Sequence, residues 1–113
     1  MQPEAKKYLY DIAEAGRLIG AFTAGITFAD YERDPMLRSA VERQFEIIGE
    51  ALTQLARLDQ PLAERITGYR RIIAFRNIIA HGYAKIDHRT VWDLVESKLP
   101  ALCQEVATLV EER

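Results

Sequence analysis

Residues 34–58 read DPMLRSAVERQFEIIGEALTQLARL and carry an unbroken helical pattern. Apolar side chains recur at steps of three and four, the period at which one face of an α-helix is buried; they are Val41, Phe45, Ile48, Leu52 and Leu55. Asp34 followed by proline has the form of an N-cap with proline at the first helical position, where its missing N–H costs nothing. The stretch therefore predicts one amphipathic helix from Pro35 to about Leu58.

Helical patterns of the same kind flank this segment on both sides. Before it, an apolar stripe at the same spacing predicts a long helix from about Pro3 to about Ala29. After it, two apolar stripes between Pro61 and about Ala80 predict a third helix that is buried on more than one face. Because a helix of this kind needs neighbours on several sides, we expect the third helix to be central.

A last helical pattern follows Asp87 and runs to Leu109. Pro100 falls inside it, and proline removes an N–H from the helix ladder and clashes with the preceding turn. We therefore expect the final helix to be kinked or split there. The sequence shows no β-alternation of useful length, and the connections are short. The predicted fold is all-α, an antiparallel four-helix bundle with a split final helix.

Size and composition limit the class of protein. The chain has 113 residues, of which 49% are hydrophobic and 28% charged, so we expect one globular domain over residues 1–113. The single cysteine, Cys103, cannot form an internal disulfide or a thiolate cluster and is interpreted as a small buried hydrophobe. No apolar run approaches the roughly 18 residues of a membrane span, and no secretory signal is apparent. We expect a soluble, cytoplasmic protein that covers an exposed apolar strip by forming a homodimer.

The charge is unevenly distributed along the chain. The net charge of −2 argues against a strongly basic nucleic-acid binder. Between Glu64 and Arg89, however, six cations stand against two anions, so this segment carries +4 and the remainder −6. Arg70 and Arg71 in this segment could contact RNA phosphates or could form a solvated helix face, and the sequence leaves both open. The local positive charge surrounds one motif.

That motif, residues 76–83, reads RNIIAHGY and places a cation, an amide, an imidazole and a phenol within eight positions. Arg76 can fork onto phosphate oxygens, and the imidazole of His81 can give or take a proton. Tyr83 supplies a hydroxyl that can donate, accept or be modified. On a helix, Arg76 and His81 converge on one ligand only at a groove or at the helix end. The set is typical of phosphodiester chemistry, and none of these residues needs a metal.

Each motif residue also has a structural interpretation. His81 could cap the last carbonyls of its helix. Arg76 could form an ion pair with Glu46 or Glu50 of the preceding helix, two glutamates that are best interpreted as a solvated or arginine-paired face. Asn77 could hold a phosphate or could fix the helix end through a backbone hydrogen bond. The residues by themselves leave these alternatives open.

The order of arginine, four residues, histidine, one residue and tyrosine resembles the defining motif of HEPN domains. The whole string at residues 76–83 is similar to the HepT-like branch, and so is ERQFEIIGEA at residues 42–51. Residues 91–92 and 99–102 fit the last helices of that family. One departure lies at residues 61–63, because many relatives carry a tryptophan after the proline where this chain has leucine and alanine. The resemblance covers nearly the whole chain.

The resemblance implies that the protein is the toxin of a two-gene toxin–antitoxin system, like other HepT-like toxins. It also implies a homodimer in which the two motifs meet in a cleft and cleave RNA without a metal or cofactor. It implies that Arg76 binds and polarises the phosphate and that His81 is the acid–base residue in attack by the ribose 2′-hydroxyl. It also implies a partner, a minimal nucleotidyltransferase antitoxin of the MntA type, which transfers AMP from ATP onto Tyr83. Our candidates for further RNA or phosphate contacts are Asn77, Arg70 and Arg71.

Two other functions are alternatives to this one. The helical dimer could be a non-catalytic, nucleotide-binding partner subunit of a nucleotidyltransferase, with Arg76 and His81 holding phosphate. That function predicts nucleotide binding without RNA turnover. A purely structural dimerisation module would leave the cluster of cations and the arginine–histidine–tyrosine spacing unexplained.

Overall fold

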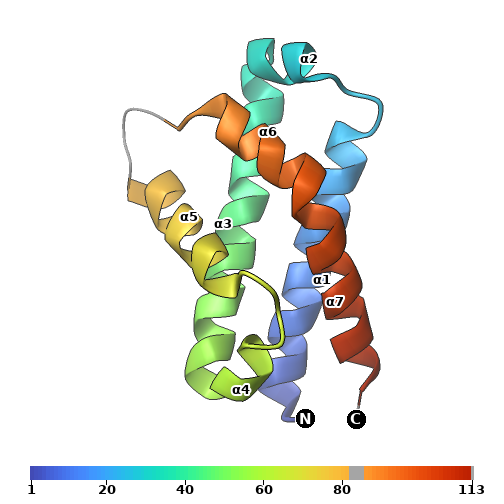
Figure 1. Ribbon diagram of the computed structural model, residues 1–113, viewed down its shortest axis with the longest axis vertical. Coiled ribbons are helices and arrows are strands. Elements are labelled where there is room, and N and C mark those ends of the chain that lie inside the picture. Colours follow the sequence, from blue (N-terminus) through green and yellow to red (C-terminus); the bar gives the residue numbers. More distant parts are fainter. Residues whose placement is uncertain (82–85, 113) are drawn as a thin grey trace.

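The computed structural model describes residues 1–81 and 86–112, and in this range the regular structure is entirely helical. Figure 1 shows the arrangement of the helices, which in chain order are α1 (Pro3–Thr23), α2 (Phe28–Arg33), α3 (Pro35–Leu58), α4 (Gln60–Ala63), α5 (Tyr69–His81), α6 (His88–Ser97) and α7 (Leu99–Glu111). The prediction of an all-α fold is confirmed. None of these helices is both long and apolar enough to cross a membrane.

Helix α3 has the bounds that its sequence predicted. The Asp34 carboxylate accepts a hydrogen bond from the backbone N–H of Leu37 at 3.1 Å, and Pro35 opens the helix. All five residues of the predicted stripe are buried, namely Val41, Phe45, Ile48, Leu52 and Leu55. Helices α1 and α5 both pack against α3. Helix α3 is therefore the central helix of the fold. The prediction that the helix after Pro61 would be central was wrong.

Helix α1 ends six residues before the predicted end at Ala29, because turn chemistry interrupts the apolar stripe. Gly25 has a φ of 71°, a left-handed conformation that glycine adopts without steric cost. Thr27 then caps α2 with a capping box, in which its hydroxyl accepts from the Asp30 N–H and its own N–H donates to the Asp30 carboxylate, both at 3.2 Å. The prediction of one continuous helix was wrong at this end.

The helix predicted from Pro61 to Ala80 is also divided, into α4 and α5. Helix α4 lasts a single turn, and residues 64–68 lead from it to α5. Gly68 ends this segment with a φ of 74° and sets the direction of α5. The prediction of one helix was wrong because apolar spacing continues across the break.

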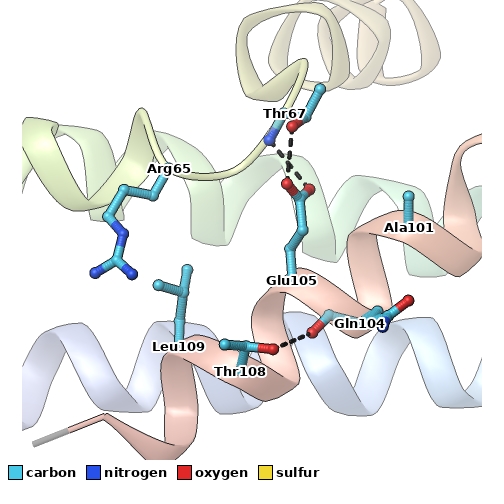
Figure 2. A pocket seen from close by; sticks show the side chains of 7 residues that line it. All are labelled: Arg65, Thr67, Ala101, Gln104, Glu105, Thr108 and Leu109. Atoms are coloured by element: carbon cyan, nitrogen blue, oxygen red, sulfur yellow. Dashed lines mark hydrogen bonds between the residues drawn. The ribbon is translucent and has the colours of Figure 1, made fainter.

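Two sets of side-chain bonds, here called the α7 clasp, tie this segment to α7. Arg65 donates two hydrogen bonds to the carboxylate of Glu112, at 2.7 and 2.6 Å. These bonds hold the pKa of the Glu112 carboxyl below its ordinary value. Glu105 accepts from the backbone N–H of Thr67 at 3.1 Å and from its hydroxyl at 2.8 Å, as Figure 2 shows. The clasp therefore holds the residues just before α5 against Glu105 and Glu112.

The final helix is split where Pro100 predicted. Helix α6 ends at Ser97, and Pro100 stands in the first turn of α7, where its missing N–H is tolerated. The change of direction lets α6 cross the bundle while α7 runs beside α1, with both chain ends at the same end of the molecule (Figure 1). Cys103 of α7 is half-buried against Gly16 of α1, and burial raises the pKa of its thiol. The predicted four-helix bundle thus consists of α1, α3, α5 and the α6–α7 pair.

Candidate active site

Helix α5 carries the arginine–histidine motif and packs mainly against α3. Its buried residues, Tyr69 and Ile72, lie in its first turns. Further along, the ring of Phe75 meets Phe45 of α3 edge-on, with 5.7 Å between the ring centroids. The C-terminal end of α5 lies at the outer edge of the molecule (Figure 1). This packing anchors one face of α5 and leaves the polar side chains of its last turns accessible.

Arg76 is held in place by contacts with two neighbours. Its Nη2 lies 2.9 Å from the Glu50 carboxylate, and its Nη1 donates to the Asn77 side-chain oxygen at 3.1 Å. The Arg76 side chain is 27% exposed, so the guanidinium is partly withdrawn from water. Its Nε is buried with no acceptor among the described residues. A phosphate would therefore reach the N–H groups on the two η nitrogens.

Gly49 permits this close approach of α5 to α3. A Cβ at this position would lie 2.6 Å from Cγ of Arg76 and closer still to its Cβ, which the backbone fixes. Only glycine leaves room for α5 at this depth, next to the Glu50 carboxylate. The sequence interpretation missed Gly49, although a glycine inside a strong helical pattern often marks a close contact.

Two of the three glutamates of α3, Glu46 and Glu50, pair with arginines. Glu50 pairs with Arg76, as one of the structural interpretations predicted, whereas Glu46 lies 3.8 Å from Arg43. A groove of about 290 Å³ runs from α1 across α3 to Arg76, and its charged lining consists of Lys7, Asp11, Arg43, Glu46, Glu50 and Arg76. Arg76 thus stands at one end of a groove that contains equal numbers of cations and carboxylates.

His81 is the last residue of α5 and is exposed. Five helical positions separate it from Arg76, which corresponds to about 140° around the helix and about 7.5 Å along it. No hydrogen bond involves its imidazole within residues 1–81 and 86–112. Within one chain, the structure therefore brings Arg76 and Asn77 together but leaves His81 apart from them.

Arg70 and Arg71 lie on different sides of α5. The Arg70 guanidinium stands 5.1 Å from the centroid of the Tyr69 ring and pairs with Glu64 at 3.4 Å. Arg71 instead lines a pocket beside the α6–α7 junction. Consecutive helical residues point about 100° apart, so the two arginines cannot follow one line of phosphates on the same face.

Tyr83 and His88 also lie close to the motif in the sequence. Tyr83, the predicted acceptor of AMP, lies outside the described residues. His88, the other histidine of the chain, is the half-buried first residue of α6, and its Nδ1 has no hydrogen-bond partner in the described part of the chain. Among those same residues, no three histidine, cysteine, aspartate or glutamate side chains gather in a way that could hold a metal ion.

The family model described as "Ribonuclease HepT-like" matches residues 12–109 of this chain. The chain is 37% identical over 102 residues to "Probable ribonuclease HepT" of Thermococcus cleftensis, an alignment that covers 90% of this chain and 92% of the relative. It is 31% identical over 105 residues to "Putative RNase MJ1380" of Methanocaldococcus jannaschii, covering 91% and 94%. No solved structure matches the chain significantly. Because the match spans almost the whole sequence and includes the arginine–histidine motif, the chain belongs to the HepT-like ribonuclease family.

Proposed function

We propose that this protein is the toxin of a toxin–antitoxin pair and acts as a metal-independent endoribonuclease. The observation that carries the proposal is the placement of Arg76, which is fixed against α3 while its η N–H groups can still bind phosphate. His81 is exposed at the end of the same helix. A cation that binds phosphate and an imidazole that transfers protons are what cleavage of RNA by its own 2′-hydroxyl requires.

In the proposed reaction, Arg76 binds a non-bridging oxygen of the scissile phosphate and stabilises the charge that develops there. An imidazole of His81 takes the proton of the ribose 2′-hydroxyl as the 2′-oxygen bonds to phosphorus. The bond from phosphorus to the 5′-oxygen breaks, and that oxygen receives a proton. The products are a 2′,3′-cyclic phosphate and a 5′-hydroxyl.

A homodimer would supply an imidazole next to Arg76, which a single chain lacks. Since His81 points about 140° away from Arg76 around α5, a second copy could provide the imidazole beside Arg76 or a second imidazole for the leaving group. Ile78, an apolar residue of the motif, is 53% exposed. A second copy would cover this side chain in a dimer in which two α5 ends meet. The separation of His81 from Arg76 within one chain supports such a dimer.

The test of this function is cleavage of RNA by the purified chain in excess chelator, with the product ends analysed. We expect 2′,3′-cyclic phosphate ends from the wild-type chain. A preparation with His81→Ala shows whether a contaminating nuclease is present. If the unmodified dimer cleaves nothing in a broad RNA panel but binds nucleotide, the protein is a non-catalytic partner subunit of a nucleotidyltransferase instead.

Regulation would act on Tyr83, two positions after His81. In our proposal, an MntA-like minimal nucleotidyltransferase directs the Tyr83 hydroxyl oxygen onto the α-phosphorus of ATP. The hydroxyl loses its proton, a phosphodiester bond joins Tyr83 to AMP, and the bond to the β-phosphate breaks so that pyrophosphate leaves. The added AMP brings negative charge and bulk next to the site where Arg76 and His81 meet RNA. Such a group repels the RNA backbone and obstructs access to the site.

The change Tyr83→Phe tests this regulation. Because phenylalanine keeps the ring but has no oxygen, we expect the variant to cleave RNA like the wild type. After incubation with the nucleotidyltransferase and ATP, the wild type should gain mass and lose activity, whereas the variant should do neither. Intact-protein mass spectrometry and RNA cleavage measure the two effects. A variant that still gains AMP would place the acceptor elsewhere.

The change Glu50→Ala tests the fixing of Arg76. Without the carboxylate at 2.9 Å, the guanidinium loses its partner on α3 and samples other orientations. We expect single-turnover cleavage to slow about tenfold, because misplacing a catalytic group is costly. Glu46→Ala is the matched control, since its carboxylate pairs with Arg43, and it should cleave like the wild type. Equal rates for Glu50→Ala and the wild type would mean that this ion pair does not position Arg76.

A further inference from the structure

A pocket of about 520 Å³ lies between the start of α5 and the α6–α7 junction. It is larger than the groove beside Arg76, which has about 290 Å³, and neither Arg76 nor His81 lines it. Arg71 does line it, and Arg71 precedes Arg76 by five positions, so the two point about 140° apart around α5. The pocket is thus on a different side of α5 from the groove beside Arg76.

The α7 clasp supports this pocket. Thr67 and Glu105 both line it, and Figure 2 shows the Glu105 carboxylate reaching across from α7 to Thr67. One oxygen of that carboxylate accepts from the Thr67 N–H and the other from its hydroxyl. Gly68, where the chain turns into α5, also belongs to the lining. Hydrogen bonds between two elements therefore keep α7 and the start of α5 at a fixed separation.

The lining combines an apolar floor with two cations. Ile72 and Leu102 are buried and Leu94 is half-buried, so the floor belongs to the packed interior. Arg71 and Lys98 come from α5 and from the junction of α6 and α7, and both are exposed. A ligand that fits this lining has an apolar part and an anionic part.

The two cations also lack the partners that most arginines of this protein have. Seven arginines form ion pairs with carboxylates, namely Arg17, Arg33, Arg43, Arg65, Arg70, Arg76 and Arg89. Arg71 and Lys98 pair with no carboxylate in residues 1–81 and 86–112. Glu105 is the acidic residue of the lining, so two cations stand against one carboxylate, whose oxygens accept hydrogen bonds from Thr67. The mouth of the pocket therefore has a local excess of positive charge, which attracts anions.

We propose that this pocket binds a nucleotide, with the base on the apolar floor and the phosphate between Arg71 and Lys98. A base is flat and largely apolar on its faces, and guanidinium and ammonium groups both bind phosphate oxygens. The volume lies in the range of about 300–1,000 Å³ that is common for small-ligand sites. The nucleotide is either free or part of an RNA strand bound outside the cleavage site. The proposal does not depend on the proposed cleavage reaction.

Binding is measured by calorimetric titration of the full chain carrying His81→Ala, so that no RNA is consumed. The probes are 5′-AMP, adenosine, inorganic phosphate and a short single-stranded RNA. We expect AMP to bind more tightly than adenosine or phosphate, because only AMP occupies both parts of the pocket. Changing Arg71 and Lys98 together to glutamine should weaken AMP about tenfold or more, since hydrogen bonds to charged groups are strong.

A matched control changes the net charge equally at a distance from the pocket, by replacing Arg17 and Arg57 with glutamine. It should leave AMP binding unchanged. A second variant, Ala101→Trp, fills the pocket from an exposed position and should block AMP while thermal unfolding stays that of the parent.

The outcomes separate the two sources of the nucleotide. Loss of AMP binding in both pocket variants identifies a free nucleotide. If the parent binds RNA but not AMP, and both pocket variants lose RNA binding, the pocket binds a nucleotide of an RNA strand. The proposal is overturned if both pocket variants bind AMP and RNA like the parent, or if the charge control weakens binding as much as the Arg71 and Lys98 changes. None of these experiments measures RNA cleavage. The ribonuclease proposal can therefore fail without affecting the test of this pocket.

Discussion

Changing His81 to alanine is expected to slow RNA cleavage by at least about 100-fold, because acid–base catalysis by a positioned side chain contributes about 10²–10⁴-fold. The imidazole is exposed and makes no hydrogen bond within the described part of the chain. Its removal should therefore leave the thermal unfolding temperature unchanged, so that the loss is one of chemistry. Single-turnover cleavage of a labelled RNA in excess chelator measures the effect, and circular dichroism checks the fold.

The matched control is His88→Ala, which removes the other of the two histidines. His88 begins α6 and is half-buried, so its loss affects local packing but should leave the cleavage rate close to that of the wild type. If His81→Ala cleaves as fast as the wild type, His81 is not the acid–base residue, and the proposed mechanism fails. Equal losses in both variants would point to an effect on the fold.

Changing Gly49 to alanine is expected to affect both stability and activity. The new Cβ would meet the Cβ and Cγ of Arg76, the latter at 2.6 Å, and the Arg76 Cβ cannot rotate away from it. Helix α5 must then shift from α3, which moves Arg76 relative to Glu50. Overpacking of this kind costs about 1–3 kcal/mol, which we expect to exceed the roughly 1 kcal/mol that alanine contributes to helix stability over glycine. The free energy of unfolding in urea should fall, and cleavage should slow about tenfold or more under conditions where both proteins are folded.

Gly20→Ala is the matched control, because it makes the same substitution at a position without close packing. Gly20 lies inside α1, and apart from its chain neighbours and the nearby backbone of its own helix nothing lies within 4 Å of the position of an added Cβ. Alanine there should leave activity unchanged and raise stability by up to about 1 kcal/mol. A Gly49→Ala protein with wild-type stability and cleavage would mean that α5 can move outward without cost, and that Gly49 does not determine the position of Arg76.

The sequence predicted those helix ends that local chemistry determines. Asp34 and Pro35 marked the start of α3, and Pro100 marked the division between α6 and α7. The breaks at Gly25 and before Gly68 were missed, because the apolar spacing continues through both. The break before Gly68 also depends on hydrogen bonds to Glu105 and Glu112. These partners are distant in the sequence, so a local pattern cannot predict them.

The motif residues of the candidate site were proposed from their types and spacing, but their surroundings could not be predicted in this way. The pairing of Arg76 was left open between Glu46 and Glu50, since which glutamate it reaches depends on the depth of α5 against α3. Gly49 sets that depth and was overlooked. The placement of Arg70 and Arg71 on different sides of α5 follows from helix geometry, but the elements that each one faces could not be known from the sequence. The roles of the motif residues and the homodimer remain predictions.

The α7 clasp also affects the order in which a newly made chain can complete its structure. Arg65 and Thr67 are bound by partners 47 and 38 positions later in the chain. While the ribosome still holds those partners, the start of α5 lacks these bonds, even though the arginine–histidine motif has already been synthesised. The start of the helix that carries the motif is therefore secured only after α7 has been synthesised. This order separates the synthesis of the motif from the fixing of its helix by residues that follow later in the chain.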